Sequence, residues 1–89
     1  MTSSVFEGKP LALDVTVTDS ELVVDLVDGR KISVPLVWFP RLLHAQQTER
    51  GNWELLGDGE GIHWPDVDED LSVAALLRGV PAVGYRKTA

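Results

Sequence analysis

Residues 21–35, ELVVDLVDGRKISVP, decide how this 89-residue chain folds. Before the centre of this stretch, apolar side chains take every second position, at Leu22, Val24 and Leu26. This alternation is typical of a strand with one buried face, because successive side chains of a strand point to opposite sides. Asp28 and Gly29 then form a dipeptide that tolerates the positive φ angles of a type I′ turn. The stretch therefore predicts a β-hairpin that turns at Asp28-Gly29.

Flanking residues extend the hairpin into a three-stranded meander. The first strand is expected at 13–17, where apolar and polar residues alternate. The middle strand, 21–27, carries apolar Val23 on its second face, which favours an inner strand covered on both sides. The last strand, 30–35, is expected to end at Pro35, because proline lacks the N–H that strand pairing needs.

Beyond the meander, the residues predict a short helix and two short strands. The helix is expected to run from Pro40, whose fixed φ angle suits a first helical turn, to about Gln47. Residues 48–52 are typical of a turn or of a single 3₁₀ turn. The two strand-like runs are 53–56 and 62–64. The loop between them has glycine at every second position and is expected to be irregular.

Residues 72–78 are expected to form the last helix, because apolar residues recur there at spacings of three and four. Gly79 stands where a left-handed C-terminal cap belongs. Either Ser72 or Asp70 can cap the start of this helix. The acids at 68–70 suit the positive end of its dipole, so they are interpreted as part of the helix N-terminus.

These expectations describe an α+β fold: a three-stranded antiparallel meander, one or two further short strands, and two short helices. The whole chain, residues 1–89, is expected to be one domain with an ordered core over about 11–80 and tails at both ends. A chain this short buries one thin core, so association into a homo-oligomer would help to stabilise it.

The composition favours a reducing compartment. The chain has no cysteine, which excludes disulfides and thiolate ligands. Residues 1–10 lack the basic and then apolar pattern of a signal peptide. No stretch approaches the roughly 20 apolar residues that cross a bilayer. A cytoplasmic protein without a membrane segment is therefore expected.

The net charge of −6 is concentrated in one part of the chain. Residues 51–77 contain seven acids and no Lys or Arg, which gives −7 and leaves +1 for the remainder. The acids are Glu54, Asp58, Glu60, Asp66, Asp68, Glu69 and Asp70. An acidic surface repels phosphate, so it disfavours nucleic acid and favours a basic protein partner. The simpler interpretation is a solvated acidic face that keeps the protein in solution.

The sequence carries no motif for catalysis: Gly-x-Ser-x-Gly, a Walker loop and His-Glu-x-x-His are all absent. The acidic run 66–70 resembles the start of an EF-hand loop, but Leu71 and Leu77 occupy the positions of its glycine and its last glutamate. A histidine-based or metal-dependent enzyme would need His44 and His63 to converge with carboxylates, and they lie in different predicted elements. No enzymatic activity, cofactor or metal is expected.

Three tryptophans supply candidates for contact with a partner. Tryptophan is enriched at interfaces, although two of the three are expected to fill the core. The segment 38–41 is the stronger surface candidate, because it follows directly after the end of the meander. The acidic region 62–70 is the second. The predicted partner-binding residues are Trp38, Phe39, Arg41, His63, Trp64, Asp66, Asp68 and Asp70.

These segments resemble a bacterial family known as domain of unknown function 2442. The resemblance rests on the hairpin 21–35, on Trp38-Phe39-Pro40-Arg41-Leu42 and on the block 61–71, and it covers about residues 13–79. It implies a small α+β domain without recognised catalytic residues. Members are often encoded beside a second small protein of toxin-like character, which implies an antitoxin-like or partner-binding role. Some relatives continue into a C-terminal helix-turn-helix, for which the ten residues after Gly79 leave no room.

The leading hypothesis is a non-catalytic protein-binding module, the antitoxin-like partner of a small protein from a neighbouring gene. The alternative is a nucleic-acid-associated transcriptional regulator that acts with a partner. Its cations would be Arg30, Lys31, Arg86 and Lys87. Four scattered cations on an acidic body disfavour direct contact with nucleic acid.

Overall fold

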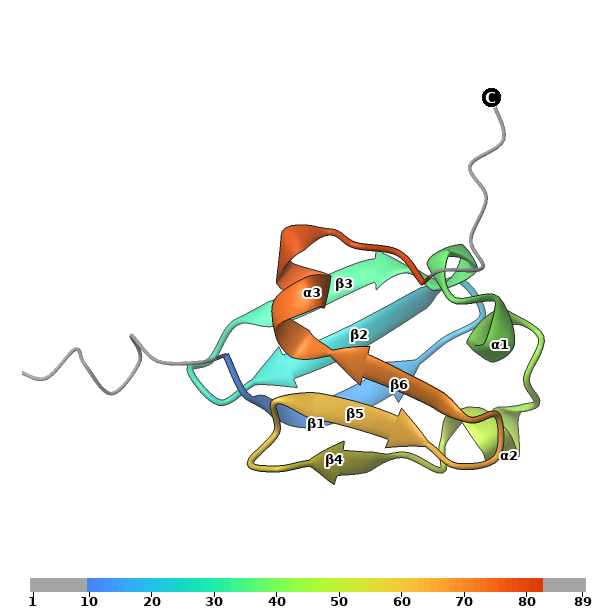
Figure 1. The fold of residues 1–89 in the computed structure, drawn as a ribbon. Helices are drawn as coiled ribbons and strands as arrows, with labels where there is room; N and C mark the ends of the chain where they lie inside the picture. The colour runs from blue at the N-terminus through green and yellow to red at the C-terminus, as the bar shows by residue number, and fades with distance from the viewer. Residues whose placement is uncertain (1–9, 83–89) are drawn as a thin grey trace, which may run out of the picture.

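The computed structural model describes residues 10–82, and the tails expected at both ends lie outside these residues. Two three-stranded antiparallel sheets enclose one core (Figure 1). The first sheet contains β1 (Ala12–Val17), β2 (Glu21–Leu26) and β3 (Lys31–Pro35), in that order. The second contains β4 (Glu54–Leu56), β5 (Gly61–Trp64) and β6 (Glu69–Ser72), in that order. The helical elements are η2 (Leu36–Trp38, 3₁₀), α1 (Pro40–Leu43), α2 (Gln47–Arg50) and α3 (Val73–Arg78).

The first sheet confirms the predicted meander and the α+β class. β2 is its central strand, and Val24 pairs with Val15 on one side and with Ile32 on the other. The inward residues of β2 are almost completely buried, whereas Val23 on its second face is only half-buried. β3 ends at Pro35, as the missing N–H requires.

The turn of this hairpin differs from the predicted type I′. Asp28 keeps a negative φ angle, and among residues 27–29 only Gly29 has a positive one, at 97°. Gly29 donates its N–H to the Leu26 carbonyl at 3.0 Å, and Leu26 donates to Arg30 at 2.8 Å. The connection is therefore a three-residue loop with glycine in the left-handed position, rather than a two-residue turn. Asp28 stabilises it by accepting the Arg30 N–H at 3.0 Å.

β6 is the main departure from the expected elements. Residues 68–70 were predicted to lie at the N-terminus of the last helix, but Glu69 begins a strand that pairs with β5. α3 starts only at Val73, and Ser72 is its cap, because the Ser72 Oγ accepts the Ala75 N–H at 3.3 Å. The predicted left-handed cap at Gly79 is confirmed, with φ 78°.

The helix expected from Pro40 to about Gln47 is also shorter than predicted. α1 ends at Leu43, and α2, with a capping box between Gln46 and Glu49, replaces the predicted turn. The two helices lie together at one end of the sheets (Figure 1). None of the helices within residues 10–82 has the length and apolar character that crossing a bilayer would require.

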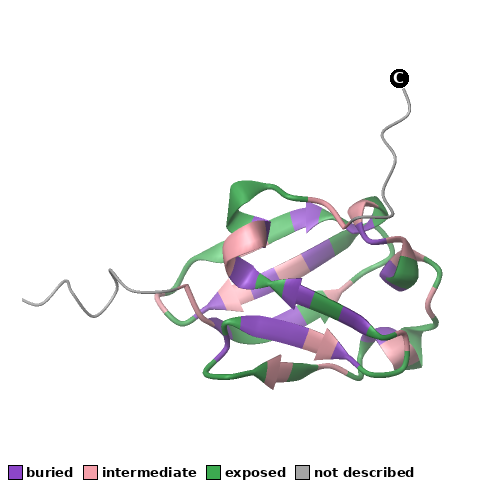
Figure 2. Ribbon diagram, in the orientation of Figure 1, coloured by how far each residue is buried: buried purple, intermediate pink, exposed green. Residues whose placement is uncertain are grey.

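The core lies between the inner faces of the two sheets, where the buried positions of the strands gather (Figure 2). Its largest fully buried side chains are Trp64, Phe39, Leu22, Leu36, Leu42, Ile62, Val24 and Val73. The two sheets are also joined through backbone, because the Ala12 N–H donates to the Gly59 carbonyl at 2.7 Å. A Cβ on Gly59 would lie 2.5 Å from the Ala12 carbonyl oxygen, so this close approach needs glycine.

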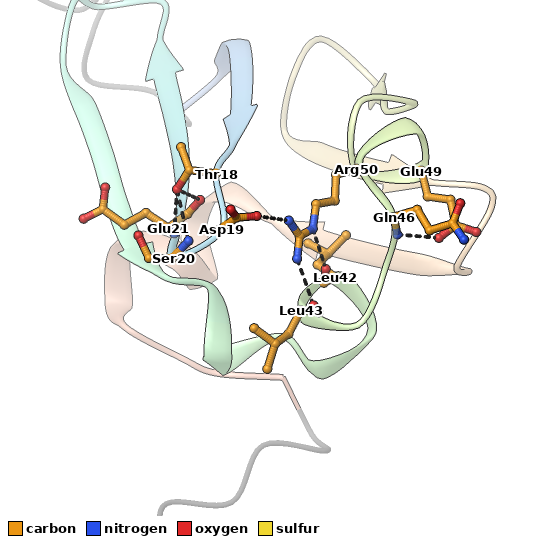
Figure 3. A network of polar contacts seen from close by, with 9 residues as sticks. All are labelled: Thr18, Asp19, Ser20, Glu21, Leu42, Leu43, Gln46, Glu49 and Arg50. Atoms are coloured by element: carbon orange, nitrogen blue, oxygen red, sulfur yellow. Dashed lines mark hydrogen bonds and ion pairs between the residues drawn. The ribbon is translucent and has the colours of Figure 1, made fainter.

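Arg50 fastens the helical end of the molecule (Figure 3). Its side chain is buried and donates to the carbonyls of Leu42 at 2.9 Å and of Leu43 at 2.8 Å. It also pairs with the Asp19 carboxylate at 3.0 Å, in the β1–β2 connection. The Arg50 carbonyl in turn accepts the indole N–H of Trp64 at 2.9 Å. One arginine thus ties both helices to both sheets.

Candidate functional site

An open groove of about 840 Å³ runs along the outer edge of β6. One wall comes from the start of α1, and the other from α3 and the segment that follows it. The lining residues are Phe39, Pro40, Arg41, Asp68, Glu69, Asp70, Leu71, Ser72, Ala75, Leu76, Val80, Pro81 and Ala82. A volume of this size lies within the range of about 300–1,000 Å³ that binding pockets usually have.

β6 is an edge strand within the described residues, since it pairs with β5 and with no other strand of residues 10–82. The Val73 N–H donates to the Glu60 carbonyl at 3.0 Å, just beyond the last pair of the ladder. Because bonded and non-bonded pairs alternate in an antiparallel ladder, Glu69 and Leu71 direct their backbone groups to β5. Asp70 and Ser72 therefore direct their N–H groups away from β5 and into the groove.

Arg41 closes the end of the groove beside α1. Its guanidinium donates to the Asp68 carbonyl and lies 3.9 Å from the Glu69 carboxylate. Asp68 adopts a left-handed backbone, with φ 54°, at the last position of the β5–β6 turn. This conformation is uncommon outside glycine but is tolerated by aspartate. The predicted candidates Arg41 and Asp68, 27 residues apart, thus form one contact.

Asp70 and His63 form a second pair, on the outer face of the second sheet. They are opposite each other in the β5–β6 register, and His63 Nδ1 contacts an Asp70 carboxylate oxygen. This hydrogen bond is the main cause that raises the pKa of His63 above its ordinary value of 6.5, and the charges of Asp70 and Glu54 act in the same direction. While the His63 ring is protonated, the two side chains form an ion pair.

Glu69 is a buried carboxyl that sequence reasoning assigned to a helix end. Its side chain points to the core side of β6 and is 10% exposed. Burial raises the pKa of Glu69 above its ordinary value, and the Arg41 guanidinium opposes this effect. Since Glu69 and Arg41 offset each other's charge, the exposed carboxylates of the groove are Asp68 and Asp70, and Asp70 also contacts His63.

Two predicted contact residues lie in the core. Phe39 is 1% exposed and Trp64 0% exposed, so both aromatic side chains fill the core, which corrects their prediction as surface contacts; Phe39 borders the groove only at its buried side. Aromatic side chains carry large apolar areas that a thin core needs. Trp38 is half-buried, and its ring makes an edge contact with Phe39 at 6.4 Å between centroids. Its carbonyl accepts the Ala82 N–H at 3.1 Å, which holds one wall of the groove.

Asp66 lies outside the groove lining. Its carboxylate accepts the Asn52 side-chain N–H at 3.0 Å and fixes the β5–β6 turn to the segment after α2. His44 is exposed at the end of α1, and among the described residues no hydrogen bond or ion pair joins it to His63 or Asp70. Within residues 10–82, no group of three or more His, Asp or Glu side chains is placed to hold a metal ion.

The cations of the described residues do not form a separate basic face. Four of the five have a carboxylate partner: Arg30 with Asp28, Lys31 with Asp25, Arg41 with Glu69, and Arg50 with Asp19. The fifth is Arg78, at the end of α3. Arg86 and Lys87, which the nucleic-acid hypothesis invokes, lie outside the described residues.

Sequence reasoning missed the apolar wall of the groove and the buried arginine. Ala75, Leu76 and Val80 line the groove, yet small and aliphatic residues at helical spacing are typical of a core face. Arg50 gave no signal, because its partners are backbone carbonyls whose position depends on tertiary structure. A weak signal for β6 did exist, since inward Leu71 stands two residues after inward Glu69.

The profile of a family described as "Protein of unknown function (DUF2442)" matches residues 12–82. A crystal structure of a protein of unknown function from Rhodospirillum rubrum is similar, with a TM-score of 0.73 and 28% identity over 86% of this chain and 95% of that one. A solution structure of an uncharacterized protein from Chromobacterium violaceum shares the fold, with a TM-score of 0.69 and 18% identity over 83% and 70%. No curated protein matches the chain.

Proposed function

We propose that this chain, which belongs to the DUF2442 family of proteins of unknown function, is a non-catalytic protein-binding module that holds its partner in the β6 groove. The observation that carries the proposal is an edge strand whose outward backbone groups open into a walled groove. Unpaired strand edges are ready templates for another chain, so a protein that leaves one inside a groove offers a binding site.

The surroundings of the groove support a protein partner. Val80 lines it and is 46% exposed, beside the half-buried Ala75 of α3. Apolar surface rimmed by charges is typical of interaction sites. The acidic groove and the paired cations make a nucleic-acid partner the weaker alternative.

In its sharper form, the proposal makes the partner a small toxin-like protein encoded beside this chain, as the family resemblance implies. The domain would then act as the antitoxin-like half of the pair by covering the partner's surface. Neither enzymatic activity nor a cofactor is needed for this role.

Co-expression with the neighbouring gene tests the proposal. A tagged domain is expected to co-purify with the neighbouring product in a defined ratio and to relieve its toxicity. Ala75→Arg places a long cation in the groove and should abolish both effects, whereas Leu77→Arg, on an exposed position of the same helix outside the groove lining, should retain them. Failure to form a complex would contradict the proposal, as would equal effects of the two variants.

A further inference from the structure

The geometry points to one occupant of the groove: an extended, basic segment of the partner protein, added to the second sheet as a strand beside β6. This inference rests on the proposed function, and it specifies the part of the partner that binds and how it is recognised. The four residues of β6 set the length of the pairing, and the groove walls set which side chains fit.

The backbone of β6 supplies the first part of the recognition. The N–H groups of Asp70 and Ser72 point away from β5, as the Val73–Glu60 hydrogen bond fixes. An incoming strand would satisfy them with its own carbonyls, which is the pattern of strand addition to a sheet edge. Other edges suit a strand less well: the Ala12 N–H of β1 already donates to Gly59, β3 packs against α3, and β4 has only three residues, none of which lines this groove.

Charge supplies the second part. The groove lining holds three carboxylates and one guanidinium. Arg41 offsets Glu69, and His63 contacts Asp70 from the β5 side, so the lining remains acidic in balance, with Asp68 and Asp70 as its exposed carboxylates. Both belong to exposed positions at the outer side of the edge. Lysine or arginine at alternate positions of the incoming strand would therefore be favoured, and acidic residues would be repelled.

Apolar contact supplies the third part. α3 and the segment after it add apolar Ala75 and Val80 to the lining, half-buried and exposed respectively, and we expect them to contact the face of the strand that turns away from Asp68 and Asp70. Because side chains of a strand alternate between two faces, basic residues would alternate with apolar ones. The expected motif is a short run of the kind basic–apolar–basic–apolar.

A selection from a random peptide library displayed on phage, made on the whole 89-residue chain, tests this inference. Selected peptides are expected to alternate basic and apolar residues. Methylation of single backbone nitrogens in a selected synthetic peptide should weaken binding about tenfold at every second residue and little at the others, since only alternate N–H groups of an added strand face β6. Uniform loss, or no loss at any position, would overturn strand addition.

Two variants of the domain give an independent readout. Asp70→Ala and Asp70→Pro both remove the carboxylate, but only proline removes the outward N–H, and an edge position with its N–H facing outward tolerates proline. Asp70→Pro should bind the peptide about tenfold more weakly than Asp70→Ala. Equal affinities would overturn the backbone contact.

The outcomes separate this inference from the proposed function. If no basic peptide is selected while the neighbouring product still co-purifies through the groove, the strand-addition inference fails and the binding module stands. If peptides bind with the alternating pattern but the neighbouring product does not co-purify, strand addition is supported and the assignment of that product as the partner fails.

Discussion

Gly29 and Gly59 have similar backbones in different surroundings, which makes them a matched pair for a stability test. Their φ angles are 97° and 108°. A Cβ on Gly29 would meet nothing within 4 Å, whereas one on Gly59 would meet the Ala12 backbone. The left-handed backbone alone costs alanine about 1–2 kcal/mol, and the steric overlap at Gly59 comes in addition.

Gly29→Ala is therefore expected to lower the free energy of unfolding by about 1 kcal/mol. Gly59→Ala should lower it by about 3 kcal/mol or more, because backbone atoms on both sides must move. Urea denaturation followed by tryptophan fluorescence measures both. Equal losses would show that Gly59 does not approach β1 as closely as described.

Arg50 gives the second prediction at this scale. Arg50→Leu would leave the Leu43 carbonyl without its donor and remove one donor from the Leu42 carbonyl, so we expect a loss of about 3 kcal/mol in the free energy of unfolding. Arg78→Leu, an exposed arginine on α3, should change it by less than about 0.5 kcal/mol. If the two variants are equally stable, the Arg50 contacts with α1 and with the β1–β2 connection do not stabilise the fold.

Because of the His63–Asp70 pair, we expect the free energy of unfolding to depend on pH. Because the folded-state pKa of His63 is raised, the stability from this pair is fully present below the ordinary value of 6.5 and is lost as the pH rises through the raised value. Titration of the His63 ring by NMR should show a pKa above 6.5, and Asp70→Ala should lower it. An unchanged pKa in Asp70→Ala would contradict the pairing.

At the scale of elements, the meander was predictable because its signals are local. Period-two alternation, Asp28-Gly29 and Pro35 each act within a few residues, and the strands fall where these signals put them. Only the turn type was wrong, because a two-residue and a three-residue loop both use glycine with a positive φ angle. Local sequence thus predicted the positions of the strands correctly, but it did not predict the geometry of the turn between them.

β6 was not predictable in the same way. One of its two inward positions is Glu69, a carboxyl, which conceals the alternation that identifies a strand. Acids followed by Ser72 and an apolar run also match a helix start, so the two interpretations compete for the same residues. The pairing of His63 with Asp70, which only the tertiary structure provides, decides between them.

The candidate site was predictable in part for the same reason. Arg41, Asp68 and Asp70 stand out as charged residues, and the structure brings them to one groove. Phe39 and Trp64 stood out as aromatic residues, but the structure buries both of them in the core. Sequence identifies groups able to make contact, whereas burial, which depends on the packing of two sheets, decides which of them reach solvent.

At the scale of the whole molecule, two small sheets pack around one core, and α3 continues directly from β6, an edge strand of the second sheet (Figure 1). This arrangement leaves the β6 edge between two walls, instead of covered by a neighbouring element. The inner faces of the two sheets thus form the core, and the β6 edge has no neighbouring strand among residues 10–82. The function proposed for the domain depends on that edge.

Amide hydrogen exchange of the domain alone and in complex with the neighbouring product tests this claim most directly. The account predicts that the N–H groups of Asp70 and Ser72 exchange rapidly in the free domain and become strongly protected in the complex. The Leu71 N–H, already bonded to β5, should change little. A complex in which new protection falls on β1 or β4, while Asp70 and Ser72 continue to exchange rapidly, would contradict it.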